Sequence, residues 1–162
     1  MIDFVPPQFG DVSFDYNSKM NEIHLREVVQ ADLPIFYDQQ REPEANRIAD
    51  FPARERDPFM SHWAKIMADP KVMLRTIVWH GQVAGNIVSW ERDNEREVGY
   101  WLGTAFWGRG IASAALAALL EIEKTRPLLG YVATGNLGSV RVLEKCGFIR
   151  QPYEGGVKLK LE

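Results

Sequence analysis

The sequence predicts an α+β fold (mixed α/β), in which a twisted, mostly antiparallel sheet of about six to seven strands is flanked by about four helices. Alternating apolar residues indicate strands in the middle and at the end of the chain, and an Ala- and Leu-rich run with helical spacing lies between them. The chain has 162 residues, 46% of them hydrophobic, and fits one domain at 22–162 without internal repeats or low-complexity tracts.

The first part of the chain is expected to supply an arm, a strand and a helix. Residues 1–21 are rich in Pro, Gly, Asp and Asn and predict an irregular arm with one short strand at 12–14. Alternation at 22–28 indicates a strand that enters the sheet. Asp32 and Pro34 mark the start of a helix, because Asp caps helices and Pro is tolerated in their first turn.

A long connection and a second helix are expected next. The segment 41–57 mixes both charges with two prolines, which predicts a connection without regular structure that is placed to cover a site. Asp57 and Pro58 then open a helix whose apolar stripe includes Phe59 and Trp63. A helix this short needs tertiary packing to be stable.

Three β-rich runs follow, at 72–80, 83–90 and 97–102. Gly81 and Gln82 lie between the first two runs, as in a tight hairpin, and a polar turn separates the second from the third. These runs are therefore expected to form an antiparallel meander.

The last third of the chain is expected to alternate helices and strands, with Pro127 and Gly147 following the ends of the two helices. The expected elements are a helix at 110–124, a strand at 128–133, a helix at 136–146 and a closing hairpin of 148–153 with 157–161. The alanine-rich helix is the most clearly marked element of the whole chain.

Charge and composition argue against several classes of function. The formal net charge of -3 lacks the basic excess that nucleic-acid-binding domains show. No run approaches the roughly 18 uninterrupted apolar residues that a membrane span needs, and the N-terminus lacks a secretory pattern. The single cysteine, Cys146, can form no intrachain disulfide, which fits a reducing cytoplasm. No spacing of His, Cys, Asp and Glu indicates a metal site.

A glycine-bearing turn within 102–113 joins a strand to a helix, and this arrangement is typical of anion binding. The first-turn amides of a helix lack internal partners and lie at the positive end of its dipole, so they can donate hydrogen bonds to a phosphate. Gly108 and Gly110 allow unusual backbone angles and a close approach of the ligand. The alternative is that the two glycines only shape a loop.

Two other phosphate-binding motifs fit this turn less well. A P-loop is excluded because no Gly-Lys-Ser/Thr ending is present. A Rossmann fingerprint at 108–113 lacks its third glycine, and the strand at 128–133 ends without the acidic residue that would hold a ribose. A nucleotide-binding domain is therefore a weak competitor.

Three blocks in the chain resemble the GNAT acetyltransferases, in particular the branch that includes ribosomal-protein N-terminal and small-molecule N-acetyltransferases. The blocks are EVGYWL at 97–102, WGRGIAS at 107–113 and NLGSVRVLEKCGF at 136–148. Together with the order of elements, the resemblance runs from Glu22 to the end of the chain. It implies a GNAT-like domain that uses acetyl-coenzyme A (acetyl-CoA) as co-substrate, with no metal.

The resemblance also implies which residues hold coenzyme A. The family's phosphate loop has the pattern Gln/Arg-x-x-Gly-x-Gly/Ala, in which Trp107, Gly110 and Ala112 take the first, fourth and sixth positions. The tryptophan departs from the broad pattern but is familiar in this branch. The implied cofactor-binding residues are Tyr100, Trp101, Leu102, Trp107, Gly108, Arg109, Gly110, Ile111, Ala112, Ser113, Asn136 and Ser139.

In the family, the strand ahead of this loop splays from the strand after its helix, and the pantetheine arm of the cofactor inserts there. The backbone of 100–102 would pair with that arm. Two implied contacts have alternatives. Arg109 is equally expected to be solvated, and Asn136 is a favourable helix N-cap, a role that is compatible with cofactor binding.

The catalytic groups are less clearly marked. The reaction needs a deprotonated amine, a polarised thioester carbonyl and a proton source for the thiolate. Many relatives use a tyrosine on the last helix as the acid, but none is present here. Ser139 matches the serine of the ribosomal-protein branch and is the candidate acid, against the alternative of an ordinary helical residue. Glu97 is the candidate base through water, against a solvated glutamate at the strand start, and further candidates are Glu95, His80 and His62.

The acceptor is expected to face the segment 41–63, since the family places acceptor recognition in its first two helices and their connection. The candidate substrate-binding residues are Arg54, Arg56, His62 and Trp63. A primary amine of a small molecule is the leading acceptor, with a protein N-terminus or lysine next. The alternative function is a non-catalytic acyl-CoA binding or sensing domain, and the resemblance leaves a homodimer open.

Overall fold

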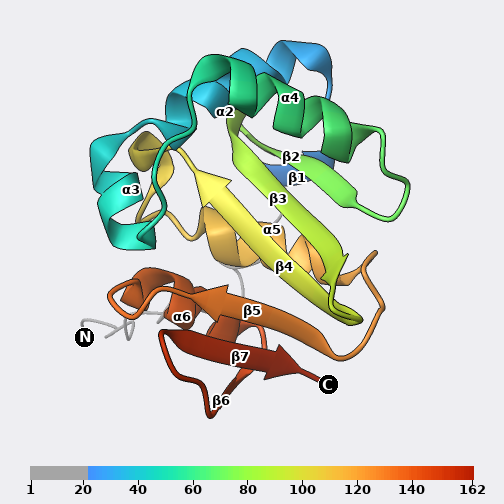
Figure 1. Ribbon diagram of the computed structural model, residues 1–162, viewed down its shortest axis with the longest axis vertical. Coiled ribbons are helices and arrows are strands. Elements are labelled where there is room, and N and C mark those ends of the chain that lie inside the picture. The colour runs from blue at the N-terminus through green and yellow to red at the C-terminus, as the bar shows by residue number, and fades with distance from the viewer. Residues whose placement is uncertain (1–21) are drawn as a thin grey trace, which may run out of the picture.

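The computed structural model describes residues 22–162, which form one seven-stranded sheet and five α-helices and confirm the predicted α+β class (Figure 1). The strands are β1 Ile23–Arg26, β2 Met73–Trp79, β3 Gln82–Arg92, β4 Glu95–Leu102, β5 Leu128–Val132, β6 Ile149–Gln151 and β7 Val157–Leu161. The helices are α2 Leu33–Gln40, α3 Pro43–Ala49, α4 Arg56–Met67, α5 Ile111–Leu120 and α6 Leu137–Lys145. The predicted arm at 1–21, with its strand at 12–14, lies outside the described residues.

The strands lie in the order β1-β2-β3-β4-β5-β7-β6. The expected antiparallel meander of β2, β3 and β4 is confirmed, as is the closing hairpin of β6 and β7. Asp93 and Asn94 connect β3 to β4 with φ angles of 51° and 62°. Two successive residues with positive φ are typical of type I′ turns, whose twist matches that of the strands, and Asn and Asp tolerate that backbone best among non-glycine residues.

β4 and β5 run parallel but stay paired at only two positions, Arg96 with Leu128 and Glu97 with Leu129. Figure 1 shows the two strands moving apart from there toward their C-terminal ends. β5 instead pairs with β7 from Leu128 to Val132. The edge of β4 that faces β5 therefore lacks a strand partner beyond Glu97, which confirms the splay that the resemblance implied.

Separate apolar cores cover the two faces of the sheet. In one core, α5 and α6 contribute buried residues that include Leu116 and Leu143. In the other, α2 and α4 contribute Phe36 and Trp63, whose ring centroids lie 5.0 Å apart. The sheet therefore separates two helical layers. None of the helices within 22–162 is long and apolar enough to span a membrane.

The prediction that 41–57 lacks regular structure is wrong, because this segment contains α3. Pro43 occupies the start of the helix, where its missing amide hydrogen costs nothing. Glu44 pairs with Arg47 one turn later at 2.6 Å, and Ala45 packs inward with 4% exposure. The charges that favoured a loop are therefore neighbours on the exposed face of a short helix.

Hydrogen bonds at both ends hold α3 in place. Glu42, the residue before the helix, accepts hydrogen bonds from the Thr104 amide at 3.0 Å and from the Thr104 hydroxyl. Asn46 donates through Nδ2 to the carbonyls of Gln40 at 2.8 Å and Phe51 at 3.0 Å. These contacts fix α3 to the connection between β4 and α5 and to its own flanking segments.

Asp32 precedes α2, but its side chain does not cap that helix as expected. The buried carboxylate instead accepts hydrogen bonds from Arg26 at 2.7 and 2.8 Å, from the Thr76 hydroxyl at 2.7 Å and from the Val29 amide at 3.0 Å. Burial acts to raise the pKa of Asp32, but these hydrogen bonds outweigh it and lower the pKa below its ordinary value. Asp32 therefore ties the start of α2 to β1 and β2.

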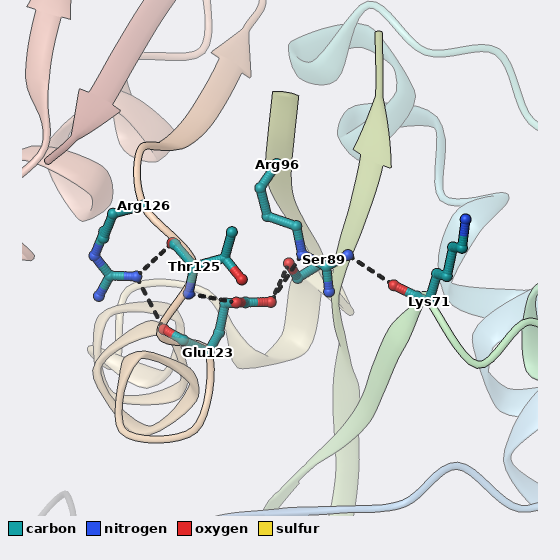
Figure 2. A network of polar contacts seen from close by, with 6 residues as sticks. All are labelled: Lys71, Ser89, Arg96, Glu123, Thr125 and Arg126. Atoms are coloured by element: carbon teal, nitrogen blue, oxygen red, sulfur yellow. Dashed lines mark hydrogen bonds and ion pairs between the residues drawn. The ribbon is translucent and has the colours of Figure 1, made fainter. Parts of the chain in front are cut away.

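A second buried carboxylate follows α5, which ends at Leu120 rather than at 124 as predicted. Glu123 is 3% exposed and accepts hydrogen bonds from the Ser89 hydroxyl at 2.8 Å, Arg96 Nε at 2.9 Å and the Thr125 amide at 2.9 Å (Figure 2). Burial acts to raise the pKa of Glu123, but the hydrogen bonds outweigh it and lower the pKa to about 2. The network joins β3, β4 and the end of α5 close to the paired base of the splay.

Candidate active site

The N-terminus of α5 presents a row of free backbone amides. Within 22–162, no amide from 108 to 113 donates to a protein acceptor, whereas the flanking Trp107 and Ala114 amides do. Gly108 and Gly110 have φ angles of 71° and 77°, which side chains disfavour. No atom lies within 4 Å of a Cβ built on Gly108, so the backbone angle rather than space requires glycine there. The free amides and the helix dipole together form a site for an anion.

Gly108 and residues 110–113 line a cavity of about 500 Å³, here called the α5 cavity. Its walls come from α3, the end of β4, the loop before α5 and the start of α6. Trp107 lies on this wall, and its Nε1 donates to the Leu102 carbonyl at 3.2 Å. Asn136 caps α6 by accepting the Ser139 amide at 3.2 Å, so its predicted capping role is confirmed. Of the predicted cofactor-binding residues, those in the wall are Tyr100, Trp101, Leu102, Trp107, Gly108, Gly110, Ile111, Ala112, Ser113, Asn136 and Ser139.

A second cavity of about 720 Å³, here called the aromatic cavity, extends from α2 and α4 across β3 and β4 to β5. Phe51, Trp63, Trp90 and Trp101 supply much of its apolar wall. Arg54 and His62 are among its polar groups, and the remaining charged residues in the wall are Glu91 and Arg92. This cavity is therefore built from side chains of several separate elements.

His62 has the ionisation behaviour of a base at neutral pH. Burial lowers its pKa, and the charges of Arg54 and Lys65 lower it further. Because the ordinary pKa of histidine is already below 7, a lowered value leaves the imidazole neutral and able to accept a proton.

The two cavities meet where β4 faces the start of α6. The residues that line both are Ala49, Tyr100, Trp101, Asn136 and Ser139. The Tyr100 hydroxyl donates to the backbone carbonyl of Ser139 at 3.4 Å. Burial raises the pKa of Tyr100 to about 12, although the bond to Ser139 opposes the shift. Two hydroxyl-bearing residues, Tyr100 and Ser139, therefore lie at the junction, and the hydroxyl of Tyr100 already donates to a backbone carbonyl.

Glu97 belongs to the wall of neither cavity among the described residues. The alternative of a solvated carboxylate is wrong, since Glu97 is 4% exposed and lies 2.7 Å from Arg92 Nη2. It sits across from Trp90 in the β3–β4 register, so strand pairing covers it. Burial raises the pKa of Glu97, while the pairing with Arg92 opposes that rise.

Two predicted site residues lie elsewhere. Arg56 was expected at the substrate site, but it lines neither cavity, and its guanidinium lies 5.9 Å from the centre of the Tyr37 ring. Arg109 was expected near the cofactor, but its guanidinium lies 5.2 Å from the centre of the Trp79 ring. The other three predicted substrate residues, Arg54, His62 and Trp63, do line the aromatic cavity.

Sequence reasoning missed two residues of the aromatic cavity. Asn86 is 8% exposed and lines the aromatic cavity from β3. A polar residue at an inward position of a strand was the available signal. Phe51 is 45% exposed, and its ring lies 6.1 Å from that of Trp101, a contact that no local pattern reveals.

No metal site accompanies these groups. Among residues 22–162, no cluster of three or more His, Cys, Asp and Glu side chains is placed to hold a metal ion.

Known proteins share this fold at low sequence identity. The structure of an acetyltransferase from Agrobacterium tumefaciens str. C58 matches with a TM-score of 0.75 and 21% identity, over 86% of this chain and 90% of that one. A spermidine N-acetyltransferase from Vibrio cholerae, in complex with CoA and spermine, matches with a TM-score of 0.73 and 16% identity, over 86% and 93%. An aminoglycoside acetyltransferase in complex with coenzyme A matches with a TM-score of 0.71 and 18% identity, over 85% and 92%.

Sequence comparison gives a relative and a family. A protein of Bacillus subtilis (strain 168), named "Putative ribosomal N-acetyltransferase YdaF", is 29% identical over 104 residues. That alignment spans 59% of this chain and 56% of the relative, just over half the length of each. The family model described as "Acetyltransferase (GNAT) domain" matches residues 22–149, from β1 to the start of β6. This match covers most of the chain. The chain therefore belongs to the GNAT family of N-acetyltransferases.

Proposed function

We propose that this protein transfers the acetyl group of acetyl-CoA to a primary amine by direct attack in a ternary complex. The observation that carries the proposal is the meeting of the two cavities at Ser139 and Tyr100. One cavity is lined by the free amides at the start of α5, and the other has aromatic walls and a neutral imidazole. A donor and an acceptor bound one in each cavity would therefore meet at the shared wall.

The α5 cavity supports coenzyme A as the donor. The amides of 108–113 would bind the pyrophosphate, as helix N-termini do for anions. The unpaired edge of β4 would accept the amides of the pantetheine arm as a further strand would. Fold relatives in complexes with CoA, which include the spermidine and aminoglycoside enzymes, agree with this choice.

The chemistry at the junction needs little beyond positioning and hydrogen-bond donors. The amine nitrogen attacks the thioester carbonyl carbon, the C–S bond breaks, and the proton lost by nitrogen balances the proton gained by sulfur. The Ser139 hydroxyl is our proposed donor to the departing thiolate. Tyr100 would be a second donor after giving up its long bond to the Ser139 carbonyl, because its raised pKa, about 12, keeps the hydroxyl protonated at neutral pH.

The amine must lose its proton before the attack, and His62 is the better candidate for the base. Its imidazole lines the aromatic cavity, and its lowered pKa leaves it neutral. Glu97 is buried against Arg92, so it serves better to position that guanidinium than to relay protons. Water would carry the proton from the amine to His62 wherever the two do not touch.

The names of the relatives and the size of the aromatic cavity bear on the class of acceptor. The names of the relatives mention spermidine, aminoglycosides and ribosomal acetylation. All three point to an amine nitrogen as the acceptor, which is the part we carry over. We favour a small-molecule amine because the aromatic cavity has a volume of about 720 Å³, in the range of small-ligand sites. A cytoplasmic location and a homodimer remain predictions.

Calorimetric titration with acetyl-CoA, beside NADH and ATP, tests the donor. Saturable binding of acetyl-CoA alone supports the proposal, and binding of a nucleotide instead contradicts it. A panel of amines with detection of thiol release then tests the transfer. Acetyl-CoA binding without turnover of any amine would favour the acyl-CoA sensing domain over the enzyme.

A further inference from the structure

Among the described residues, some charged side chains around the aromatic cavity form ion pairs, whereas Arg54 does not. This difference bears on the choice of acceptor. Arg54 lines the cavity, and no carboxylate lies within ion-pair distance of its guanidinium in the part of the chain that the structure describes. The guanidinium lies 5.6 Å from the centre of the Phe51 ring and close enough to His62 to lower its pKa. Arg54 is therefore a half-buried cation among cavity residues, and none of the residues at 22–162 supplies its counter-ion.

A buried side chain fixes the backbone of Arg54. Gln40 is 8% exposed and belongs to α2. Its Oε1 accepts the Arg54 amide at 2.8 Å, and its Nε2 donates to the Arg54 carbonyl at 2.9 Å. The paired bonds use both ends of one amide group, so the connection between α3 and α4 is held at this residue. Arg54 is thus placed by the fold rather than by a mobile loop.

The other charges of the cavity are already neutralised or face away. Arg92 pairs with Glu97 at 2.7 Å. Glu91 alternates with Trp90 along β3 and shares its face of the sheet with Ser89, which hydrogen-bonds Glu123 on the α5 side. The carboxylate of Glu91 is thus directed to the face opposite Trp90. The carboxylate that strand register places on the face of Trp90 is Glu97, and Arg92 already pairs with it.

The remaining walls favour an apolar body. Phe51, Trp63, Trp90 and Trp101 all line the cavity. The uncharged amide and hydroxyl residues of the wall include Gln40, Asn86, Asn136 and Ser139. A guanidinium without a partner, next to aromatic rings, matches a planar carboxylate attached to an apolar or aromatic group, because arginine binds carboxylates through two parallel hydrogen bonds. A polyamine or an aminoglycoside carries several positive charges, which Arg54 would repel.

We infer that the acceptor is a small primary amine that also carries a carboxylate and an apolar or aromatic body, with Arg54 binding the carboxylate. This inference rests on the proposed acetyl transfer and names its substrate class. It departs from the spermidine and aminoglycoside acceptors in the names of the fold relatives. Arg54 is then a specificity residue that binds the carboxylate of the acceptor and does not touch the reacting atoms.

Matched pairs of amines test the inference, because each pair differs only in the carboxylate. Phenylalanine is compared with phenethylamine, and 4-(aminomethyl)benzoate with benzylamine, so that two spacings between amine and carboxylate are covered. Spermidine and kanamycin serve as polycations. We expect kcat/KM for the carboxylate member of at least one pair to exceed that of its partner by about tenfold or more, the size of a charge-assisted hydrogen bond.

Variants then assign the preference to one side chain. In Arg54→Met, the ratio of kcat/KM between the carboxylate amine and its partner is expected to fall to about one. Arg54→Lys is expected to keep part of this preference. Arg56→Met is the matched control, since Arg56 lies two residues along and outside both cavities. It is expected to keep the full ratio. Acetyl-CoA affinity and thermal melting should stay unchanged in all three variants.

Three results would overturn the inference. They are equal or better turnover of the amines without a carboxylate, faster turnover of spermidine or kanamycin, and an Arg54→Met ratio equal to that of the parent. In each of these cases acetyl transfer still occurs, so the proposed function stands. Acetyl-CoA binding with no turnover of any amine overturns both the inference and the proposed function.

Discussion

The α5 cavity and the aromatic cavity are adjacent but are built in different ways. The α5 cavity takes its anion site from six consecutive residues, 108–113, and from their backbone amides. The aromatic cavity takes its walls from side chains on α2, α4, β3, β4, β5 and the connection between α3 and α4. Backbone chemistry defines the first site, and side-chain identity defines the second.

This difference explains why one fold can keep its donor and change its acceptor. Any sequence that forms the turn and the helix start supplies the same amides, so substitutions there act mainly through backbone shape or added charge. A single exchange in the aromatic cavity, at Phe51 or Arg54, is expected to alter the proposed acceptor binding without affecting the start of α5. Function can therefore diverge on the acceptor side while the donor side stays fixed.

The largest expected effect is on stability and comes from Glu123, which hydrogen-bonds residues of β3 and β4. Glu123→Gln removes the buried charge that Ser89, Arg96 and Thr125 hold, and should lower the free energy of unfolding by about 3 kcal/mol at pH 7. Urea unfolding measures the change. Both acetyl-CoA binding and acceptor turnover should fall together on warming, because β3 and β4 loosen together.

The pH dependence of this effect has a definite sign. Since the folded pKa of Glu123 is about 2 and the ordinary value is 4.5, the stabilisation is fully present above 4.5 and is lost as the pH falls toward 2. The gap between parent and variant should therefore narrow between pH 5 and pH 3. Glu121→Gln is the control, because Glu121 is exposed and should change stability by under about 0.5 kcal/mol. A gap independent of pH would contradict the assignment.

A charge in the row of amides should separate the two cavities. Ala112→Glu places a carboxylate where the pyrophosphate is proposed to bind, and like-charge repulsion should weaken acetyl-CoA binding by about 100-fold. Calorimetry measures the dissociation constant. Ala118→Glu, further along the same helix and outside both cavities, should leave it within about threefold. Equal losses in both variants would mean that the helix, and not the anion site, was damaged.

Removing the hydroxyl at the junction should affect chemistry more than binding. Ser139→Ala is expected to lower kcat by about tenfold to 100-fold, with the acetyl-CoA dissociation constant within about twofold of the parent. Stopped-flow thiol release together with calorimetry separates the two quantities. Tyr100→Phe is the companion variant, and it tells which hydroxyl serves the thiolate. An unchanged kcat in Ser139→Ala would contradict Ser139 as the donor to the thiolate and would favour Tyr100 instead.

The smallest effect is expected at the rim of the aromatic cavity. Phe51→Ala removes a half-exposed ring beside Trp101 and Arg54, which should raise KM for the acceptor by about threefold to tenfold. The acetyl-CoA dissociation constant and kcat should not change. Ile149→Ala, an exposed apolar residue on β6, serves as the control and should leave all three quantities unchanged. A changed acetyl-CoA dissociation constant in Phe51→Ala would contradict the assignment of donor and acceptor to separate cavities.

The sequence predicted the strands and helices well where the pattern was periodic. The meander, the alanine-rich helix and the closing hairpin follow from local alternation, helical spacing and turn residues. It failed at α3, because a seven-residue helix with mixed charges has no apolar stripe of its own and is held by Glu42 and Asn46 from outside. The side chain of Asp32 also went to a buried network instead of the expected cap.

The sequence by itself determined the anion site, since 108–113 are neighbours in the chain and the backbone of a helix start behaves alike whatever surrounds it. Only the tertiary structure decided that Arg54 lines the aromatic cavity while Arg56 lies outside it, and that Glu97 is buried against Arg92. A side chain's environment depends on elements far away in the sequence. The local sequence pattern does not show which of those elements will pack against it. The proposed donor site is a property of one segment, whereas the proposed acceptor site exists only after the layers have packed.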